Sequence, residues 1–191
     1  RVEAVENTKY LQTLSGLFAE MSRGTMELGE LQELFMPIMH TILMIYQYST
    51  HYNTAPRLVV LIREICNEII RQCMGQVAGS QVKEDMKEKS SVKSALSKVT
   101  SAFEVCIKFK EAYFEYKSKV KNQWKIASSA LFVRLDAFAE RCQDLMLMAK
   151  TIMQFNKLER IELGGTKGKT LTETLKQISD EFKKAVESFR A

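Results

Sequence analysis

Residues that interrupt helices are scarce in this chain. Its 191 residues include two prolines and eight glycines, and the apolar residues recur at spacings of three and four rather than in alternation. Because 46% of the residues are hydrophobic, the composition also excludes a disordered chain. The sequence predicts an all-α fold, an elongated bundle of about six helices of which two are long and amphipathic, with a short extended piece at 161–163.

The chain also lacks a hydrophobic run long enough to cross a membrane, which takes about 18 residues. The nearest candidate, Phe35 to Tyr48, is interrupted by Pro37, His40, Thr41 and Gln47 and favours a buried helix. The chain begins without Met or a signal peptide, so we expect an internal fragment.

Histidines and paired cysteines, the usual carriers of catalysis and metal binding, are few. The two histidines, His40 and His51, belong to no catalytic pattern. No C-x-x-C pair is present, and two of the four cysteines, Cys66 and Cys73, lie two helical turns apart, about 10 Å, which is too far for a disulfide. We therefore predict buried, reduced thiols in an intracellular protein, with no catalytic residue, no cofactor and no metal.

A glycine-rich turn, Lys157 to Leu171, is the one segment that resembles a nucleotide site. Gly168, Lys169 and Thr170 match the end of a phosphate loop, but the first glycine of that motif falls on Leu163, and a helix rather than a strand precedes the turn. We interpret the turn as a corner between two helices, followed by Thr170 or Thr172 as a helix cap. The residues of this turn are Gly164, Gly165, Lys167 and Gly168.

The apolar periodicity predicts the positions of the helices. Pro37 either opens the main part of the second helix or kinks it, and continuous apolar lines run through the third helix from Leu58 to Ile69 and through the fifth from Leu131 to Ile152. We expect a hairpin part over 1–77, a loop over 78–86 and a long-helix part over 87–191, together forming one continuous domain. The predicted helices are Val2 to Met21, Leu31 to Thr50, Ala55 to Val77, Lys87 to Asn122, Ser128 to Leu158 and Leu171 to Phe189.

The net charge of +5 is modest and spread along the chain, and its densest basic segment is Lys108 to Lys125, where aromatic residues are interspersed with lysines. Phe109, Tyr113 and Tyr116 follow helical spacing, which predicts an aromatic core stripe with the lysines on a solvated face. Such a face suits an acidic protein surface, and a lipid or nucleic-acid surface remains the alternative. The predicted interaction face consists of Lys117, Lys119, Lys121 and Lys125.

Several ordered segments of the chain carry a resemblance to one known family. They are NTKYLQTL (Asn7 to Leu14), YNTAPRLVVLIREICNEII (Tyr52 to Ile70), FKEAYFEYKSKV (Phe109 to Val120), Trp124 with FVRLDAFAERCQDL (Phe132 to Leu145), and FNKLERIELGGTKGKTL (Phe155 to Leu171). In this order they resemble the N-terminal tail of dynein heavy chains, above all the axonemal ones. The resemblance covers most of the chain and weakens over Gly75 to Ser101.

This resemblance implies a non-catalytic segment of a microtubule motor, located in the cytoplasm and cytoskeleton and in the axoneme of a cilium or flagellum. The implied partners are other dynein heavy chains, intermediate and light chains, and docking complex subunits, with no membrane, nucleic acid or small-molecule ligand. The ATPase would lie outside this chain. An unrelated helical adaptor is the remaining alternative.

Overall fold

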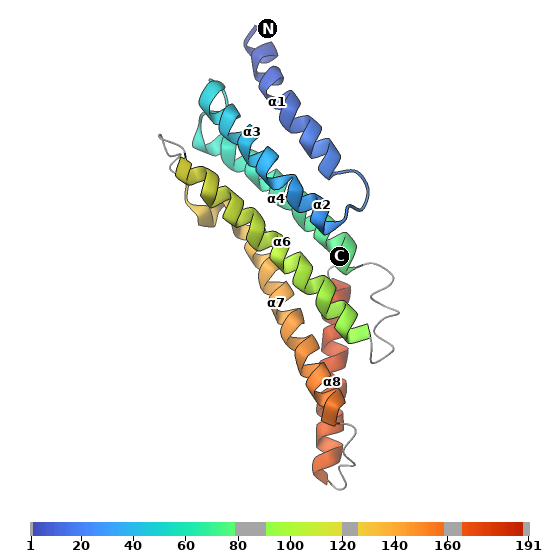
Figure 1. The fold of residues 1–191 in the computed structure, drawn as a ribbon. Coiled ribbons are helices and arrows are strands. Elements are labelled where there is room, and N and C mark those ends of the chain that lie inside the picture. Colours follow the sequence, from blue (N-terminus) through green and yellow to red (C-terminus); the bar gives the residue numbers. More distant parts are fainter. Residues whose placement is uncertain (1, 79–90, 120–125, 159–165, 189–191) are drawn as a thin grey trace. The chain divides into compact units, whose positions relative to one another are not determined.

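The computed structural model describes residues 2–78, 91–119, 126–158 and 166–188 (Figure 1). Every regular element in these ranges is a helix, which confirms the all-α prediction. The extended piece expected at 161–163 lies outside the described residues. The helices are α1 (Val2–Met21), α2 (Leu28–Glu33), α3 (Phe35–Tyr48), α4 (Ala55–Val77), α6 (Ser91–Lys119), α7 (Ser128–Leu158) and α8 (Thr166–Ser188).

Three of the predicted helices, α1, α4 and α7, have the bounds expected from the apolar periodicity. The part of α6 that the structure describes, Ser91–Lys119, lies within the predicted range, and the predicted ends of that helix fall outside the described residues. In these segments the regular recurrence of apolar residues predicts the helix, and no proline or glycine within them ends it early.

The predicted second helix is divided in two at Leu34. The backbone N–H of Leu34 turns back to the carbonyls of Gln32 and Leu31, which ends α2, and α3 begins at Phe35. Pro37 therefore lies in the first turn of α3, where the missing N–H of proline leaves no helical hydrogen bond unmade. Of the two alternatives for Pro37, opening the main part of the helix is the correct one.

The last helix begins five residues earlier than predicted, at Thr166 instead of Leu171. Lys167, Gly168, Thr170 and Thr172 are therefore helical, and the prediction that Thr170 or Thr172 caps the helix is wrong. The hydroxyl of Thr172 donates instead to the carbonyl oxygen of Gly168 at 2.9 Å, the bond of a threonine inside a helix to the preceding turn.

The chain forms two compact units, the first composed of Arg1–Cys73 with Glu104–Phe138 and the second of Met74–Phe103 with Ala139–Ala191. The domain boundaries expected from the sequence, at 77 and 87, stay a prediction. Within the first unit, α1 runs alongside α3 (Figure 1), and α4 is joined to α7 by Arg63, whose guanidinium donates twice to the carbonyl oxygen of Ala130 at 2.8 and 2.5 Å.

The core of the first unit contains a cluster of aromatic rings. Phe109 of α6 meets Phe35 of α3 edge to face at a centroid distance of 5.1 Å, and Phe132 of α7 meets Tyr113 of α6 in the same way at 5.1 Å. Such pairs stabilise a core beyond the burial of their area. The apolar line of α4 closes the core, because all four of its residues are buried: Leu58, Ile62, Ile65 and Ile69.

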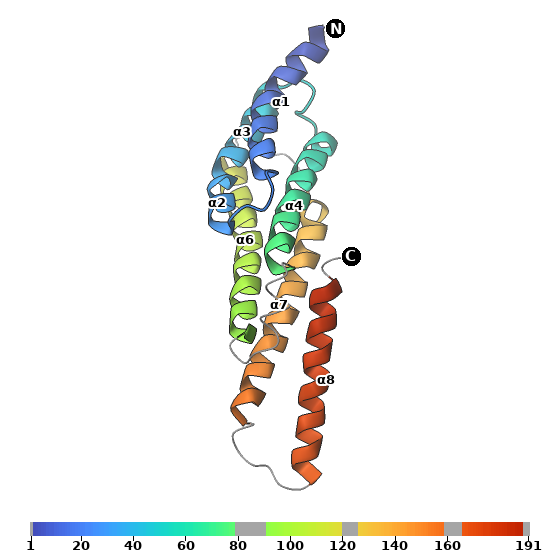
Figure 2. The same cartoon turned by 90° about the vertical axis from the view of Figure 1, so that its right-hand side faces the viewer.

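The second unit packs α8 against the later part of α7 (Figure 2). The α7 line predicted from the sequence is buried in both units, which confirms it. Its members in the first unit are Leu131, Leu135 and Phe138, and those in the second are Cys142, Leu145, Ala149 and Ile152. The line on α8 is covered unevenly, since Phe182 and Val186 are buried whereas Leu171 is 36% exposed. The contribution of α8 to the core therefore comes mainly from its C-terminal half.

Candidate interaction surface

The predicted lysine face is only partly described, and its described members have partners within the first unit. Lys117 is half-buried, with its Nζ 5.9 Å from the centre of the Tyr113 ring and 3.5 Å from the carbonyl oxygen of Ile126. Lys119 is exposed and pairs with Glu115 at 2.6 Å, which raises the pKa of its ammonium. Lys121 and Lys125 lie outside the described residues.

The rest of the basic segment is also tied into the bundle. The Nζ of Lys110 is 2.6 Å from Asp136 of α7 and 5.7 Å from the centre of the Phe132 ring. Lys108 is exposed and donates to Gln32 of α2 at 2.7 Å. These lysines therefore act as side-chain links between helices and are not a uniformly solvated row.

The aromatic stripe on α6 is confirmed for two of its three members. Phe109 and Tyr113 are fully buried, whereas Tyr116 is half-buried and meets the ring of His40 of α3 at a centroid distance of 6.4 Å. Phe114, which belongs to the same segment, is 46% exposed. Part of the aromatic surface of α6 thus reaches the outside of the unit.

The most distinctive exposed surface of the first unit lies on α3 and was missed by the sequence analysis. One side of this helix is buried, including Phe35, Ile38 and Ile42. The opposite side is exposed, so the prediction of a buried helix holds for one face only. We call the exposed residues Met36, His40, Met44 and Tyr48 the α3 stripe; each is separated from the next by four positions.

The α3 stripe contains no acidic or basic residue apart from the titratable His40. Met36 and Met44 are each 40% exposed and Tyr48 is 59% exposed. The sequence signal for this surface is visible in hindsight, because Phe35 to Tyr48 has no Asp, Glu, Lys or Arg on either face. A helix of a soluble bundle normally places charges on its solvated side, so this absence marks α3 as unusual.

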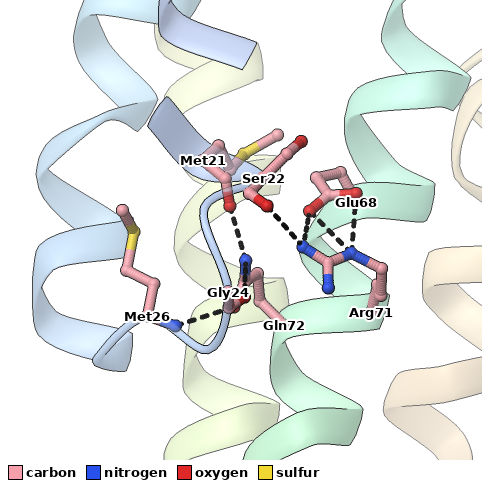
Figure 3. A network of polar contacts seen from close by, with 7 residues as sticks. All are labelled: Met21, Ser22, Gly24, Met26, Glu68, Arg71 and Gln72. Carbon is pink, nitrogen blue, oxygen red and sulfur yellow. Dashed lines mark hydrogen bonds and ion pairs between the residues drawn. The ribbon is translucent and has the colours of Figure 1, made fainter. Parts of the chain in front are cut away.

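Three side chains of α4 hold the connection between α1 and α2 (Figure 3). Gln72 is 1% exposed; its Nε2 donates to the carbonyl oxygens of Met21 and Gly24, at 2.5 and 3.1 Å, and its Oε1 accepts the N–H of Met26 at 2.9 Å. One side chain thus binds three backbone groups of a turn that lies 46 to 51 residues earlier in the sequence.

The neighbouring ion pair of α4 reinforces this connection. Arg71 binds the carboxylate of Glu68, which is 9% exposed, and its Nη2 also donates to the carbonyl oxygen of Ser22 at 3.3 Å. Gly24 has a φ of 54°, a left-handed conformation that glycine adopts without strain. The turn between α1 and α2 is therefore specified both by its own sequence and by α4.

The four cysteines of the chain are buried thiols that form no disulfide, which confirms that part of the prediction. Burial, together with smaller contributions from the nearby Cys106 and Asp136, raises the pKa of the Cys66 thiol to about 12. Cys66 is thus a protonated thiol at neutral pH, whereas the reactive form of cysteine is the thiolate.

Among the residues that the structure describes, His, Cys, Asp and Glu form no cluster suited to a metal ion.

The two histidines have different surroundings. His40 belongs to the α3 stripe, whereas the ring and the carbonyl oxygen of His51 accept hydrogen bonds from the guanidinium of Arg57. Within the described ranges, no helix is both long and apolar enough to span a membrane. Of the predicted glycine turn, Lys167 and Gly168 lie in α8, while Gly164 and Gly165 fall outside the described residues.

The fold defines the class of this chain as a helical-bundle protein. Its helices pack through buried apolar lines and leave their other faces exposed. Residues 1–191 match the family described as "Dynein heavy chain, N-terminal region 1". The chain therefore belongs to the dynein heavy chains and represents part of their N-terminal region. This assignment removes the alternative of an unrelated helical adaptor. It also agrees with a non-catalytic segment, since the N-terminal tail is separate from the ATPase motor.

The relatives of this chain are axonemal dyneins. It is 39% identical over 193 residues to the dynein beta chain of the flagellar outer arm of Chlamydomonas reinhardtii, with 98% of this chain aligned. It is 33% identical over 177 residues to the ciliary dynein beta chain of Heliocidaris crassispina, with 88% aligned, and 29% identical over 195 residues to human dynein axonemal heavy chain 17, with 98% aligned. The chain spans 4% of the length of each of these relatives.

Proposed function

We propose that this chain is a structural and assembly segment of the tail of an axonemal dynein heavy chain. Its helical bundles hold the motor within a multi-subunit complex through contacts with other heavy chains, with intermediate and light chains, or with docking complex subunits on the axonemal microtubule. The proposed location is the axoneme of a cilium or flagellum. The whole protein would be an ATP-driven motor, whereas this segment itself needs no cofactor.

The observation that carries the proposal is the match to the dynein N-terminal region along the entire chain, together with relatives from flagella and cilia. The structure supplies a physical reason for a mechanical role. Each unit is built from long helices with continuous buried apolar lines, and such helices resist bending because many side-chain contacts act in parallel.

Affinity capture from ciliary extract, combined with crosslink mapping, tests this proposal. The tagged chain should recover dynein heavy or intermediate chains or docking subunits, with crosslinks that map to exposed residues of its helices. A control variant carries Phe109→Ala, which removes a fully buried ring; because this change destabilises the bundle, the variant should recover less of the same partners. Recovery of only membranes or RNA would contradict the proposal.

Binding of lipid or nucleic acid through residues 108–125 is the competing function, and the contacts of the lysines disfavour it. Lys110 and Lys119 are paired with carboxylates, and Lys117 lies against Tyr113. Binding of this electrostatic kind falls steeply with salt, because phosphates release counterions when lysines neutralise them. Tight, salt-sensitive binding to anionic vesicles or to RNA, abolished by charge reversal at Lys117, Lys119 and Lys121, would restore this alternative.

A further inference from the structure

We propose that a face formed by α4 and α7 in the first unit binds an acidic, amphipathic helix of a partner protein. The face consists of Val60 and Arg63 of α4 together with Val133 and Arg134 of α7, and we call it the arginine face; all four residues are exposed. Such binding deepens the proposed assembly role and rests on it, because it gives that role one surface and one class of partner.

Two hydrogen bonds between the helices position the arginines. The guanidinium of Arg63 donates to the carbonyl oxygen of Ala130, and Nη1 of Arg134 donates to the side-chain oxygen of Asn67 at 3.0 Å. In both bonds the residue on α7 lies 67 positions after its partner on α4, so the two helices run side by side in the same direction here (Figure 2). Arg63 and Arg134 are therefore separated by about one helical turn, or about 6 Å along the helix axes.

The acceptors of the two arginines are uncharged, so their positive charge remains available to a partner. A guanidinium carries five N–H donors, and these bonds use two of them in Arg63 and one in Arg134. Of the acids in the same parts of α4 and α7, Glu68 and Asp136 form ion pairs with other residues, and the exposed Glu64 is the third. Two arginines against one remaining acid give this side of the unit a net positive charge.

Apolar side chains flank the arginines. Val60 and Val133 are each 59% exposed. Val60 lies three positions after Arg57 and three before Arg63, which places it between two arginines on the surface of α4. Val133 lies three positions after Ala130, the acceptor of Arg63. Exposed apolar side chains beside arginines that have uncharged acceptors favour contact with a protein partner over contact with solvent.

An acidic helix fits the spacing of this face. Arginine binds a carboxylate through two parallel N–H···O bonds. Two glutamates at positions i and i+4 of a partner helix are also about 6 Å apart along its axis, so one of them can meet each arginine, while neighbouring apolar residues cover Val60 and Val133. The bonds to Ala130 and Asn67 hold the guanidiniums in place before the partner arrives, which lowers the entropic cost of binding.

Other partners fit the arginine face less well. A second copy that presented the same face would set arginine against arginine, which is repulsive. A surface rich in phosphates, such as RNA or an anionic membrane, would neutralise the arginines, but it would place the valines against a sugar–phosphate backbone or polar headgroups and would meet the negative charge of Glu64. Carboxylates on an amphipathic helix satisfy both the charged and the apolar part of the face.

Fluorescence anisotropy of a labelled peptide titrated with the 191-residue chain tests the proposal. The probe is a helical peptide of about 20 residues, made of alanine, leucine and glutamate with glutamates at i and i+4, and the control peptide has glutamines in their place. We expect saturable binding of the glutamate peptide and at least about tenfold weaker binding of the glutamine peptide. An RNA oligonucleotide and phosphatidylserine vesicles, tested in the same way, should bind more weakly than the glutamate peptide.

Substitutions on the face locate the binding site. Arg63→Gln and Arg134→Gln should each weaken binding of the glutamate peptide by at least about fivefold, whereas Arg23→Gln, at an exposed arginine between α1 and α2, should leave it unchanged. Val60→Glu should also weaken binding, because it adds a negative charge beside Arg63 without removing a hydrogen bond. Its control is Val5→Glu on α1, where Val5 is 70% exposed. Circular dichroism should show every variant to be as helical as the parent.

Three results would overturn the proposal: the glutamate peptide does not bind saturably, it binds no better than the glutamine peptide, or Arg134→Gln and Val60→Glu leave its affinity unchanged. Tighter binding of RNA or vesicles through the same arginines would also overturn it, because the partner would then belong to another class. In all of these cases, recovery of dynein subunits from ciliary extract would still support the tail assignment. Failure of that capture with peptide binding intact would instead contradict the proposed function and leave the arginine face standing as a site for acidic helices.

Discussion

Replacing Gln72 by leucine should detach the turn between α1 and α2 from α4. The amide side chain makes three hydrogen bonds to backbone groups of Met21, Gly24 and Met26, and leucine of similar size makes none. At a net value of about 0.5 to 1.5 kcal/mol for each of the three bonds, offset partly by the added apolar burial, we expect a loss of about 1 to 4 kcal/mol in the free energy of unfolding.

Urea unfolding followed by circular dichroism measures this loss, and hydrogen exchange locates it. The amide of Met26 should exchange faster in Gln72→Leu, because its acceptor is the side-chain oxygen of Gln72. Gln72→Glu separates the two halves of the interaction, since a carboxylate still accepts from Met26 but sets its second oxygen against two carbonyl oxygens. We expect it to be destabilising as well.

Gln154→Leu provides the matched control, because Gln154 is an exposed glutamine in the helix α7. Its effect on the free energy of unfolding should be within about 0.5 kcal/mol of zero. If Gln72→Leu and Gln154→Leu have the same stability, the reasoning that a single buried side chain fixes the turn is refuted.

Further predictions concern the core, a thiol, a surface charge and the glycine-rich segment. Phe109→Ala should cost about 3 to 5 kcal/mol in urea unfolding, because it removes a fully buried ring from the aromatic cluster. Cys66 should resist alkylation in the folded chain, because its pKa rises from about 9 to about 12 on folding. The free energy of unfolding should therefore fall by about 1.4 kcal/mol for each pH unit between pH 9 and pH 12. Cys66→Ala should remove the part of this pH dependence that comes from the thiol. Lys119→Ala should leave the Tm unchanged because the pair with Glu115 is exposed. Magnesium and ATP should cause no thermal shift, and a saturable stabilisation would overturn the interpretation of the glycine-rich segment.

Much of the fold could be predicted because the apolar residues of this chain recur regularly. The bounds of α1, α4 and α7 and the buried line from Leu131 to Ile152 follow from that recurrence. Pro37 indicated that the second helix opens or kinks near it, but not that the break falls at Leu34, three residues earlier. The start of α8 was placed too late because Gly168 was interpreted as part of a turn, although it is a helical residue.

The candidate surface was predicted less well than the fold. The sequence predicted the lysines of this segment on a solvated face, but it does not show that Lys110 reaches Asp136, 26 residues away. The α3 stripe was missed because Phe35 to Tyr48 has no charged residue on either face. Such a sequence does not show whether neighbouring helices bury one face of the helix or both. Burial on only one side depends on which helices pack against it, and this is a property of the assembled unit.

The sequence by itself determined that the chain is helical, which residues form its seams and to which family it belongs, because these follow from local periodicity and from ordered motifs. Only the tertiary structure decided that Gln72 holds a turn some fifty residues away, that the lysines of α6 have partners, and that one uncharged side of α3 faces outward. These features depend on contacts between segments distant in the chain, for which the periodicity of any single helix contains no information.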